Sequence, residues 1–425
     1  MLSTLRNAWK VPELRNRLIW TVFLVAIFRI GSHIPVPGID TSALENLTKS
    51  GSLIAFYDLI SGGAFKNFSI FALGVVPYIN ASIIMSLLTI SIPQLEQLSK
   101  EGEDGRKKIQ KITRVASVFL GFITAYGTYV LIYNQGALKN TSGLVTFIIM
   151  VTLVVGSTFS MWLGDQITAK GIGNGVSLLI FINIISRLPF TLYQIIVLKN
   201  AEQVNIVEIF LFLVFALALL AAVIFLSLAE RRIHVQYAGK SVAGKVYKGQ
   251  STHIPLSIIG STVIAIIFSM SVMQFPDVLA QFFPNAQWSR WIISGTWSPF
   301  NRGTWLYIAI YAILTIFFTW FYTQVTFKPE EMAENMHKSA GFIPGIRPGQ
   351  PTADYLTRVL DRISIFGGVF AAVIAVIPLI IENYSGFKGI SFGGTALLIM
   401  VSVALEVMRQ LQSQLVMRHY QGFLK

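Results

Sequence analysis

Cysteine is absent from the 425 residues of this chain. Its absence excludes disulfide bonds, thiolate catalysis and cysteine-based metal sites. Histidine is scarce as well, since the five histidines are scattered and show no HExxH spacing of the kind that binds zinc. From these two shortages we expect no metal site.

Charged residues are the next shortage. They make up 12% of the chain, about half of what soluble proteins carry, whereas 54% of the residues are hydrophobic. The hydrophobic residues gather in runs of about twenty, the length at which a helix crosses a bilayer. We therefore predict an all-α polytopic membrane protein. The ten predicted spans are Leu18–Ile34, Phe68–Ile92, Ile112–Tyr133, Leu144–Leu163, Ile172–Leu188, Val207–Leu228, Ile254–Phe275, Leu306–Phe327, Ile363–Ile381 and Phe392–Val407.

The placement of positive charge orients these spans. The first span is expected to remain uncleaved, because HIPVPG (33–38) follows it in place of a small-residue cleavage site. Most of the 33 Lys and Arg residues fall on the side of the N-terminus. Loops rich in Lys and Arg stay in the cytoplasm, so both termini are predicted to be cytoplasmic. The charge beyond what orientation needs is available to anionic lipid or a cytoplasmic partner.

Ten spans divide into five and five near residue 200. This division predicts an N-terminal half, 1–200, and a C-terminal half, 201–425. Because five is odd, two similar halves would be inverted in the membrane, with a pathway at their interface. The sequence shows no convincing repeat, so the symmetry is an expectation. Two cytoplasmic loops, 229–252 and 328–362, are long and mix charge with Gly and Pro.

Polar residues inside the spans are few. Arg29 lies near the outer end of the first span, where it either snorkels to the interface or pairs with a neighbouring helix. Pro77 and Asn80 lie in the second span. They indicate either an ordinary kink with a helix-pairing amide, or a helix that moves or lines a path.

Two cytoplasmic motifs also have alternative interpretations. Arg347 lies between two Pro-Gly elements, which is typical of either a solvated loop tip or a preorganised cationic contact. Gly239-Lys240-Ser241 resembles the end of a phosphate-binding loop, but His234 occupies the position where that motif needs a glycine. We therefore expect no nucleotide site and no energy-transducing site.

Several long motifs, taken in order, resemble the SecY family of bacterial protein translocase channels. The resemblance extends over essentially the whole chain. The motifs are FALGVVPYINASI (71–83), KEGE (100–103), MWLGDQIT (161–168), GIGNG (171–175), ERRI (230–233), VQYA (235–238), GIRPG (345–349) and GGTALLI (393–399).

The resemblance implies two five-helix halves around an hourglass pore with an aliphatic ring at its waist. A motif in the fifth span permits a shift of one turn for the two residues of the ring that it contributes. The ring residues implied are Val75, Ile79, Ile180, Ile184, Ile267 and Ile399. A plug is implied at about 54–68, around Leu59, Ile60, Ser61, Gly62 and Gly63. A lateral gate is implied between the second and seventh spans, with Asn80 on its second-span side.

The same resemblance implies the function and the partners. The chain would be a passive channel and no enzyme, without cofactors, in the inner (cytoplasmic) membrane. It would pass unfolded secretory polypeptides and release signal sequences and other hydrophobic segments into lipid. Arg347 would bind the motor ATPase SecA, and Arg231, Arg232 and Lys240 would contact SecA or the ribosome. SecE and SecG are implied as partner subunits. The loop between Tyr237 and His253 carries fewer arginines than the family leads us to expect.

Two other function classes were weighed. A secondary transporter with inverted repeats would need a polar substrate site at mid-membrane, where the spans offer few candidates. A membrane scaffold would leave Pro77, Asn80 and the glycine-rich segments unexplained.

Overall fold

The computed structural model describes most of the chain. The described residues are 2–39, 62–64, 68–134, 136, 138, 142–200, 204–237, 241–242, 245–246, 251–257, 262–283, 286–295, 297–301, 303–384 and 394–422. The long helices are α2 (Pro12–Gly31), α5 (Val76–Ser91), α7 (Glu103–Asn134), α8 (Gly143–Lys170), α9 (Gly175–Asn200), α10 (Ile206–Leu228), α11 (Thr262–Phe282), α13 (Trp305–Phe327), α15 (Gln350–Tyr384) and α16 (Gly394–Gly422). The short helices are α1 (Leu2–Lys10), α6 (Pro93–Lys100), α12 (Gln287–Ser294) and α14 (Pro329–Lys338). The strands are β1 (Glu230–Tyr237), β2 (Ser241–Val242), β3 (Lys245–Val246), β4 (Ser251–Ser257) and β5 (Gly341–Phe342).

Each predicted span overlaps one of the long helices. Within the described residues, six helices are long and apolar enough to cross a membrane, or seven if the bent pair α5 and α6 counts as one. The six are α8, α9, α10, α15, α16 and the helix that starts at Trp305. The mostly helical fold is therefore as predicted. That all ten segments cross the membrane stays a prediction.

The second span differs from its predicted limits. Its helix α5 begins at Val76 rather than at Phe68, because the chain from Ser69 to Val75 forms hydrogen-bonded turns. The span ends at a sharp bend of 100° between α5 and α6. Pro93 is the first residue of α6, and a proline at that position cannot donate the bond that would continue the preceding helix.

The predicted start of the seventh span, Ile254, is wrong. Residues Ser251–Ser257 form strand β4, and α11 begins only at Thr262. Strand β4 pairs antiparallel with β1, which also pairs with β5. The sequence of β1 alternates buried Ile233 and Val235 with exposed neighbours, the period of a half-buried strand. The two long loops that were predicted to be cytoplasmic therefore contribute a three-stranded sheet, which the all-α prediction missed.

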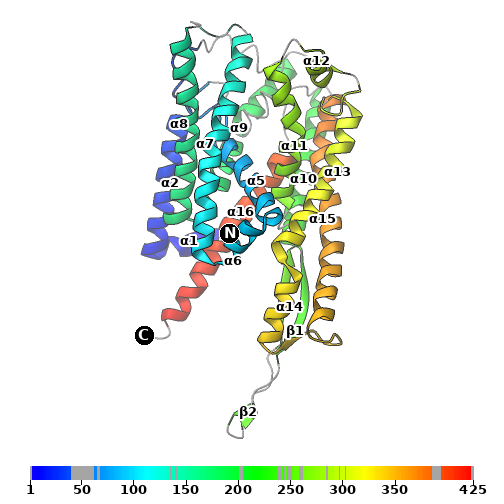
Figure 1. Cartoon of the computed structure of the whole chain (residues 1–425). Helices are drawn as coiled ribbons and strands as arrows, with labels where there is room; N and C mark the ends of the chain where they lie inside the picture. Colours follow the sequence, from blue (N-terminus) through cyan, green and yellow to red (C-terminus); the bar gives the residue numbers. More distant parts are fainter. Residues whose placement is uncertain are drawn as a thin grey trace.

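The sheet packs against helices on its buried face. Ile233, Val235 and Leu256 share a hydrophobic cluster with Ala333 of α14 and Leu356 of α15. Figure 1 shows α14 and β1 at one end of the molecule, the end toward which the C-terminal part of α16 points. This end forms the candidate cytoplasmic surface.

The long helices form two groups (Figure 1). Helix α8 packs against α2, α7 and α9 in one group, and α13 packs against α11 and α15 in the other. Helix α16 contacts α9 of the first group and both α10 and α15 of the second. The division of the chain into two halves near residue 200 and their inverted symmetry both stay predictions.

A carboxylate joins α7 to α8 at one end of the first group. Asp165 lies 2.8 Å from the guanidinium of Arg114 and accepts a hydrogen bond of 3.4 Å from Gln110. We predict that Asp165→Ala destabilises the protein by about 1 kcal/mol, because the Arg114 side chain is partly solvated, and lowers Tm by roughly 2 °C. Thermal unfolding in detergent measures the change.

The matched control is Lys107→Ala on α7. Lys107 lies 3.8 Å from Glu103, and both side chains are largely exposed to solvent. Its Tm should stay at the parent value, and an equal fall in both variants would contradict the role assigned to Asp165.

Candidate functional site

The six predicted ring residues come together in one hydrophobic cluster. Four of them are buried in it: Val75, Ile180, Ile184 and Ile399. Ile79 and Ile267 are partly buried and pack against the same cluster. The six side chains come from α5 and its N-terminal turn, α9, α11 and α16, so both helix groups contribute.

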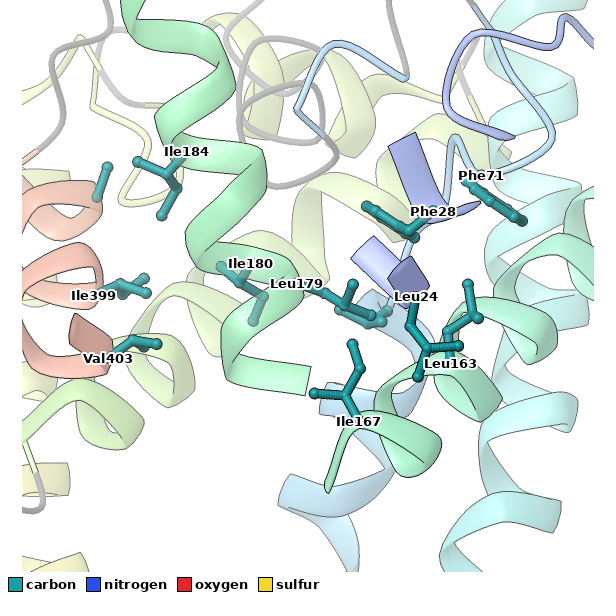
Figure 2. Packing of buried hydrophobic residues seen from close by; sticks show 12 residues of the cluster. Leu24, Phe28, Phe71, Leu163, Ile167, Leu179, Ile180, Ile184, Ile399 and Val403 are labelled. Atoms are coloured by element: carbon teal, nitrogen blue, oxygen red, sulfur yellow. The ribbon is translucent and has the colours of Figure 1, made fainter. Parts of the chain in front are cut away.

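Helical spacing explains how α9 and α16 meet. Ile180 and Ile184 are four residues apart and therefore lie on one face of α9. Figure 2 shows both side chains directed toward Ile399 and Val403 of α16, while Leu179 points the other way. The meeting faces are aliphatic, so they offer no hydrogen-bonding side chain to anything that passes between them.

The turn before α5 holds Val75 in place. Phe71, four residues earlier, stacks on Phe28 of α2 and on Phe159 of α8, with ring centroids 5.4 and 5.9 Å apart. At Gly156 of α8, a β-carbon would collide with the carbonyl oxygen of Ile70. The turn therefore lies directly against the α8 backbone, and this close approach fixes the depth of Val75.

Asn80 makes a polar contact between the two predicted gate helices. Ser271 of α11 donates a hydrogen bond of 3.2 Å from its Oγ to the Oδ1 of Asn80 on α5. Asn80 follows Ile79 directly, and Ser271 lies one turn after Ile267. The contact is therefore adjacent to the aliphatic ring. Ser271 is not among the predicted gate residues, because it lies 191 residues from Asn80 and no local sequence pattern links the two.

The predicted plug is described only in part. Leu59, Ile60 and Ser61 lie outside the described residues. Gly62 and Gly63 have φ angles of +66° and +91°, a left-handed backbone region that glycine adopts at little cost.

The predicted partner-contact residues that the structure describes lie on the three-stranded sheet and the loop beside it. Arg231 and Arg232 are exposed on β1, and Arg347 is exposed on the loop that follows β5. The carbonyl oxygen of Arg347 accepts a hydrogen bond of 2.8 Å from Thr352. Pairing of β5 with β1 brings the three arginines onto one structural unit, the sheet unit, at the candidate cytoplasmic surface. Lys240 lies outside the described residues.

This sheet unit also contacts α16, the helix that carries Ile399. Arg409 of α16 lies 3.4 Å from the carboxylate of Glu230, the first residue of β1. It also donates a hydrogen bond of 3.3 Å to the carbonyl oxygen of Ser227. No cluster of three or more His, Asp or Glu side chains suited to a metal ion occurs within the described part of the chain.

Comparisons with known proteins match the whole chain. A family model described as SecY matches residues 69–408. The protein translocase subunit SecY of Halalkalibacterium halodurans is 42% identical over 435 residues, covering 100% of both chains. The subunit of Bacillus subtilis is 41% identical over 441 residues, again with 100% of both chains covered. The subunit of Thermus thermophilus is 40% identical over 439 residues, covering 100% of this chain and 98% of the relative.

Solved structures share the fold at lower identity. A structure described as a protein conducting channel has a TM-score of 0.66 and 18% identity, with 96% of each chain covered. A second structure, whose description concerns the plug domain of the SecY protein, has a TM-score of 0.64 and 17% identity, with 96% of each chain covered. Sec61 in a canine ribosome–channel complex has a TM-score of 0.60 and 18% identity, covering 96% of each chain.

The contact between Asn80 and Ser271 predicts a crosslink. The chain has no cysteine, so a pair introduced as Asn80→Cys and Ser271→Cys would contain its only thiols. Because the two native side-chain oxygens are 3.2 Å apart, a short thiol-specific bifunctional reagent should join α5 to α11. The yield of the crosslink is measured by gel mobility after the polypeptide is cleaved between α5 and α11, because only crosslinked fragments stay together.

The control pair is Ser82→Cys with Ser271→Cys. Ser82 is two residues from Asn80 and lies on a different face of α5. Equal crosslinking of the two pairs would contradict the assigned contact.

Proposed function

Because the chain belongs to the SecY family, we propose that it is the central channel-forming subunit of a protein translocase. It passes unfolded secretory polypeptides across the cytoplasmic membrane and releases hydrophobic segments sideways into lipid. The observation that carries this proposal is the convergence of six aliphatic side chains from both helix groups on one cluster.

Aliphatic side chains suit a constriction that must seal and also let polypeptides pass. A narrow apolar neck excludes water and ions by dewetting. It offers no fixed hydrogen bond, so chains of many sequences slide past it at similar cost. Ile180, Ile184 and Ile399 are each at most 6% exposed, which supports a closed state for the described arrangement.

The lateral gate opens between α5 and α11, and its polar contact is weak enough to break. A neutral hydrogen bond such as that between Ser271 and Asn80 contributes about 0.5–1.5 kcal/mol. A signal sequence that moves into lipid gains several times this amount by burying apolar side chains. The crosslinked Asn80→Cys and Ser271→Cys pair is therefore expected to block export.

A plug around Gly62 and Gly63 covers the outer side of the constriction. The positive φ angles of both glycines support a tight turn at the base of a displaceable segment. For one structural neighbour the plug domain is described as stabilising the closed state and maintaining a membrane seal. We extend that role to this chain.

Energy for transport comes from partners at the cytoplasmic surface. Arg231, Arg232 and Arg347 form an exposed cationic surface there, which is suited to SecA or to the ribosome. One structural neighbour was solved in a ribosome–channel complex. SecE and SecG complete the complex, both termini face the cytoplasm, and anionic lipid contacts the remaining positive charge.

The constriction predicts an ion leak on polar substitution. Ile399→Asn places an amide in the apolar neck, so the neck should hydrate, and ion conductance of reconstituted vesicles should rise at least tenfold. Export of substrates with defective signal sequences should rise with it. Ile399→Val is the control, because it keeps the neck apolar and should stay sealed. A leak no greater in the asparagine variant than in the valine variant would remove Ile399 from the ring.

The cationic surface predicts a loss of motor-driven export. Arg347→Glu reverses one charge on an exposed loop, so SecA-dependent translocation should fall at least tenfold while the protein still accumulates in the membrane. Arg358→Glu, on exposed α15 surface, makes the same charge change away from the loop and should retain export. Normal export by the Arg347 variant would refute the proposed contact.

A further inference from the structure

Arg29 is the charged residue within the first predicted span, and its partner lies in the predicted plug. Its guanidinium Nη1 donates a hydrogen bond of 3.2 Å to the carbonyl oxygen of Gly62. Arg29 is half-buried in the protein. A charged donor strengthens a hydrogen bond, and surroundings of low polarity strengthen it further. Of the two roles considered for Arg29, this contact favours the internal one.

Gly62 fits a site that accepts only glycine. Its φ of +66° strains any residue with a β-carbon. A β-carbon at this position would also come within 2.6 Å of the Oδ1 and 2.8 Å of the Cα of Asn183 on α9. Asn183 lies between the ring residues Ile180 and Ile184. Gly62 is therefore held between Arg29 on one side and the helix of the constriction on the other.

The donor is fixed in position by its own helix. Phe28, the preceding residue, is fully buried and stacks on Phe71 with an angle of 5° between the ring planes. At Gly31 a β-carbon would collide with the Phe71 ring, so this end of α2 lies directly against the turn before α5. Arg29 is thus carried by a helix that packs closely on the wall of the constriction, while its acceptor belongs to the segment proposed to move.

The chain after the plug is fastened to the same end of α2. The amide of Val36 donates to the carbonyl of Phe68 at 2.9 Å, and the amide of Ile70 donates to that of Ile34 at 2.9 Å. These bonds fix one end of the plug segment. The hydrogen bond from Arg29 to Gly62 holds the same segment at a second position, six residues before Phe68 in the chain.

We propose that Arg29 is a latch that holds the plug in the closed channel through the Gly62 carbonyl. This inference rests on the proposed channel function and adds a positioning residue to it. A carbonyl acceptor suits a releasable latch, because breaking the bond separates no ion pair and leaves a cation that water at the outer opening solvates. Arginine suits the role because its planar guanidinium stays charged and donates from several N–H groups.

The test uses the complete complex in reconstituted vesicles, with resting ion leak and export as readouts. One charge-assisted hydrogen bond corresponds to roughly a tenfold change in the closed-to-open ratio. Arg29→Gln should therefore raise the leak about tenfold and also raise export of a substrate with a defective signal sequence. Arg29→Lys keeps the charge and should fall between parent and Gln variant. Arg15→Gln, at the exposed opposite end of α2, is the control and should behave as the parent.

A glycine pair tests whether the position of Gly62 beside Arg29 matters for the seal. Gly62→Ala and Gly63→Ala both place a β-carbon on a left-handed backbone, but only the one at Gly62 meets Asn183, whereas at Gly63 nothing lies within 4 Å. Gly62→Ala should displace the Gly62 carbonyl from Arg29 and therefore leak more than Gly63→Ala. An equal leak in both variants would contradict the latch even if Arg29→Gln fails to accumulate in the membrane.

Two results would overturn the latch. One is an Arg29→Gln channel that stays sealed and still rejects defective signal sequences. The other is an equal fall in export of normal and defective substrates, which indicates a structural or lipid-binding role for Arg29. Ile399→Asn in the same vesicles separates the hypotheses: if it leaks while Arg29→Gln does not, the latch fails and the channel stands. If Ile399→Asn is sealed and no substrate is exported, the proposed function fails.

Discussion

The aliphatic cluster between α5, α9, α11 and α16 is the interaction on which the rest of the structure depends. It is the place where the two helix groups meet through side chains that carry no polar atom. Its packing is stabilised by about 25 cal/mol for each Å² of apolar surface that closure removes from water in the pore. Such packing is strong in sum and non-directional, so it can be broken and formed again without a specific partner. A channel that must close after each passage needs this property.

Two polar contacts beside this cluster involve elements that are proposed to move. Ser271 and Asn80 join the two gate helices, and Arg29 joins α2 to Gly62. Each is a single hydrogen bond, so neither would resist displacement by a substrate that gains more from binding. The fixed side is heavily packed by comparison, with Phe71 stacked between Phe28 and Phe159. The contrast separates a rigid wall from its movable parts.

Apolar run length predicted where the long helices lie, because a membrane span leaves a composition signal of about twenty residues. It did not predict their ends. The alternation in β1 is short and rich in charge, so composition predicts a loop for Ile233 and Val235, and the predicted seventh span starts within β4, at Ile254. The ring residues followed from resemblance to a family, and helical spacing then accounts for Ile180 and Ile184. The partners of Asn80 and Arg29 lie 191 and 33 residues away in sequence, and no local pattern encodes such distances.

The central claim is that a polypeptide in transit passes through the aliphatic cluster. The most direct measurement is crosslinking from an arrested, translocating chain to single cysteines placed one at a time in this cysteine-free protein. We expect crosslinks at positions 79, 184 and 399, and none at Ile313 of α13, whose side chain is 65% exposed and lies outside the cluster. Crosslinks at Ile313 as strong as those at the ring positions, or none at the ring, would contradict it.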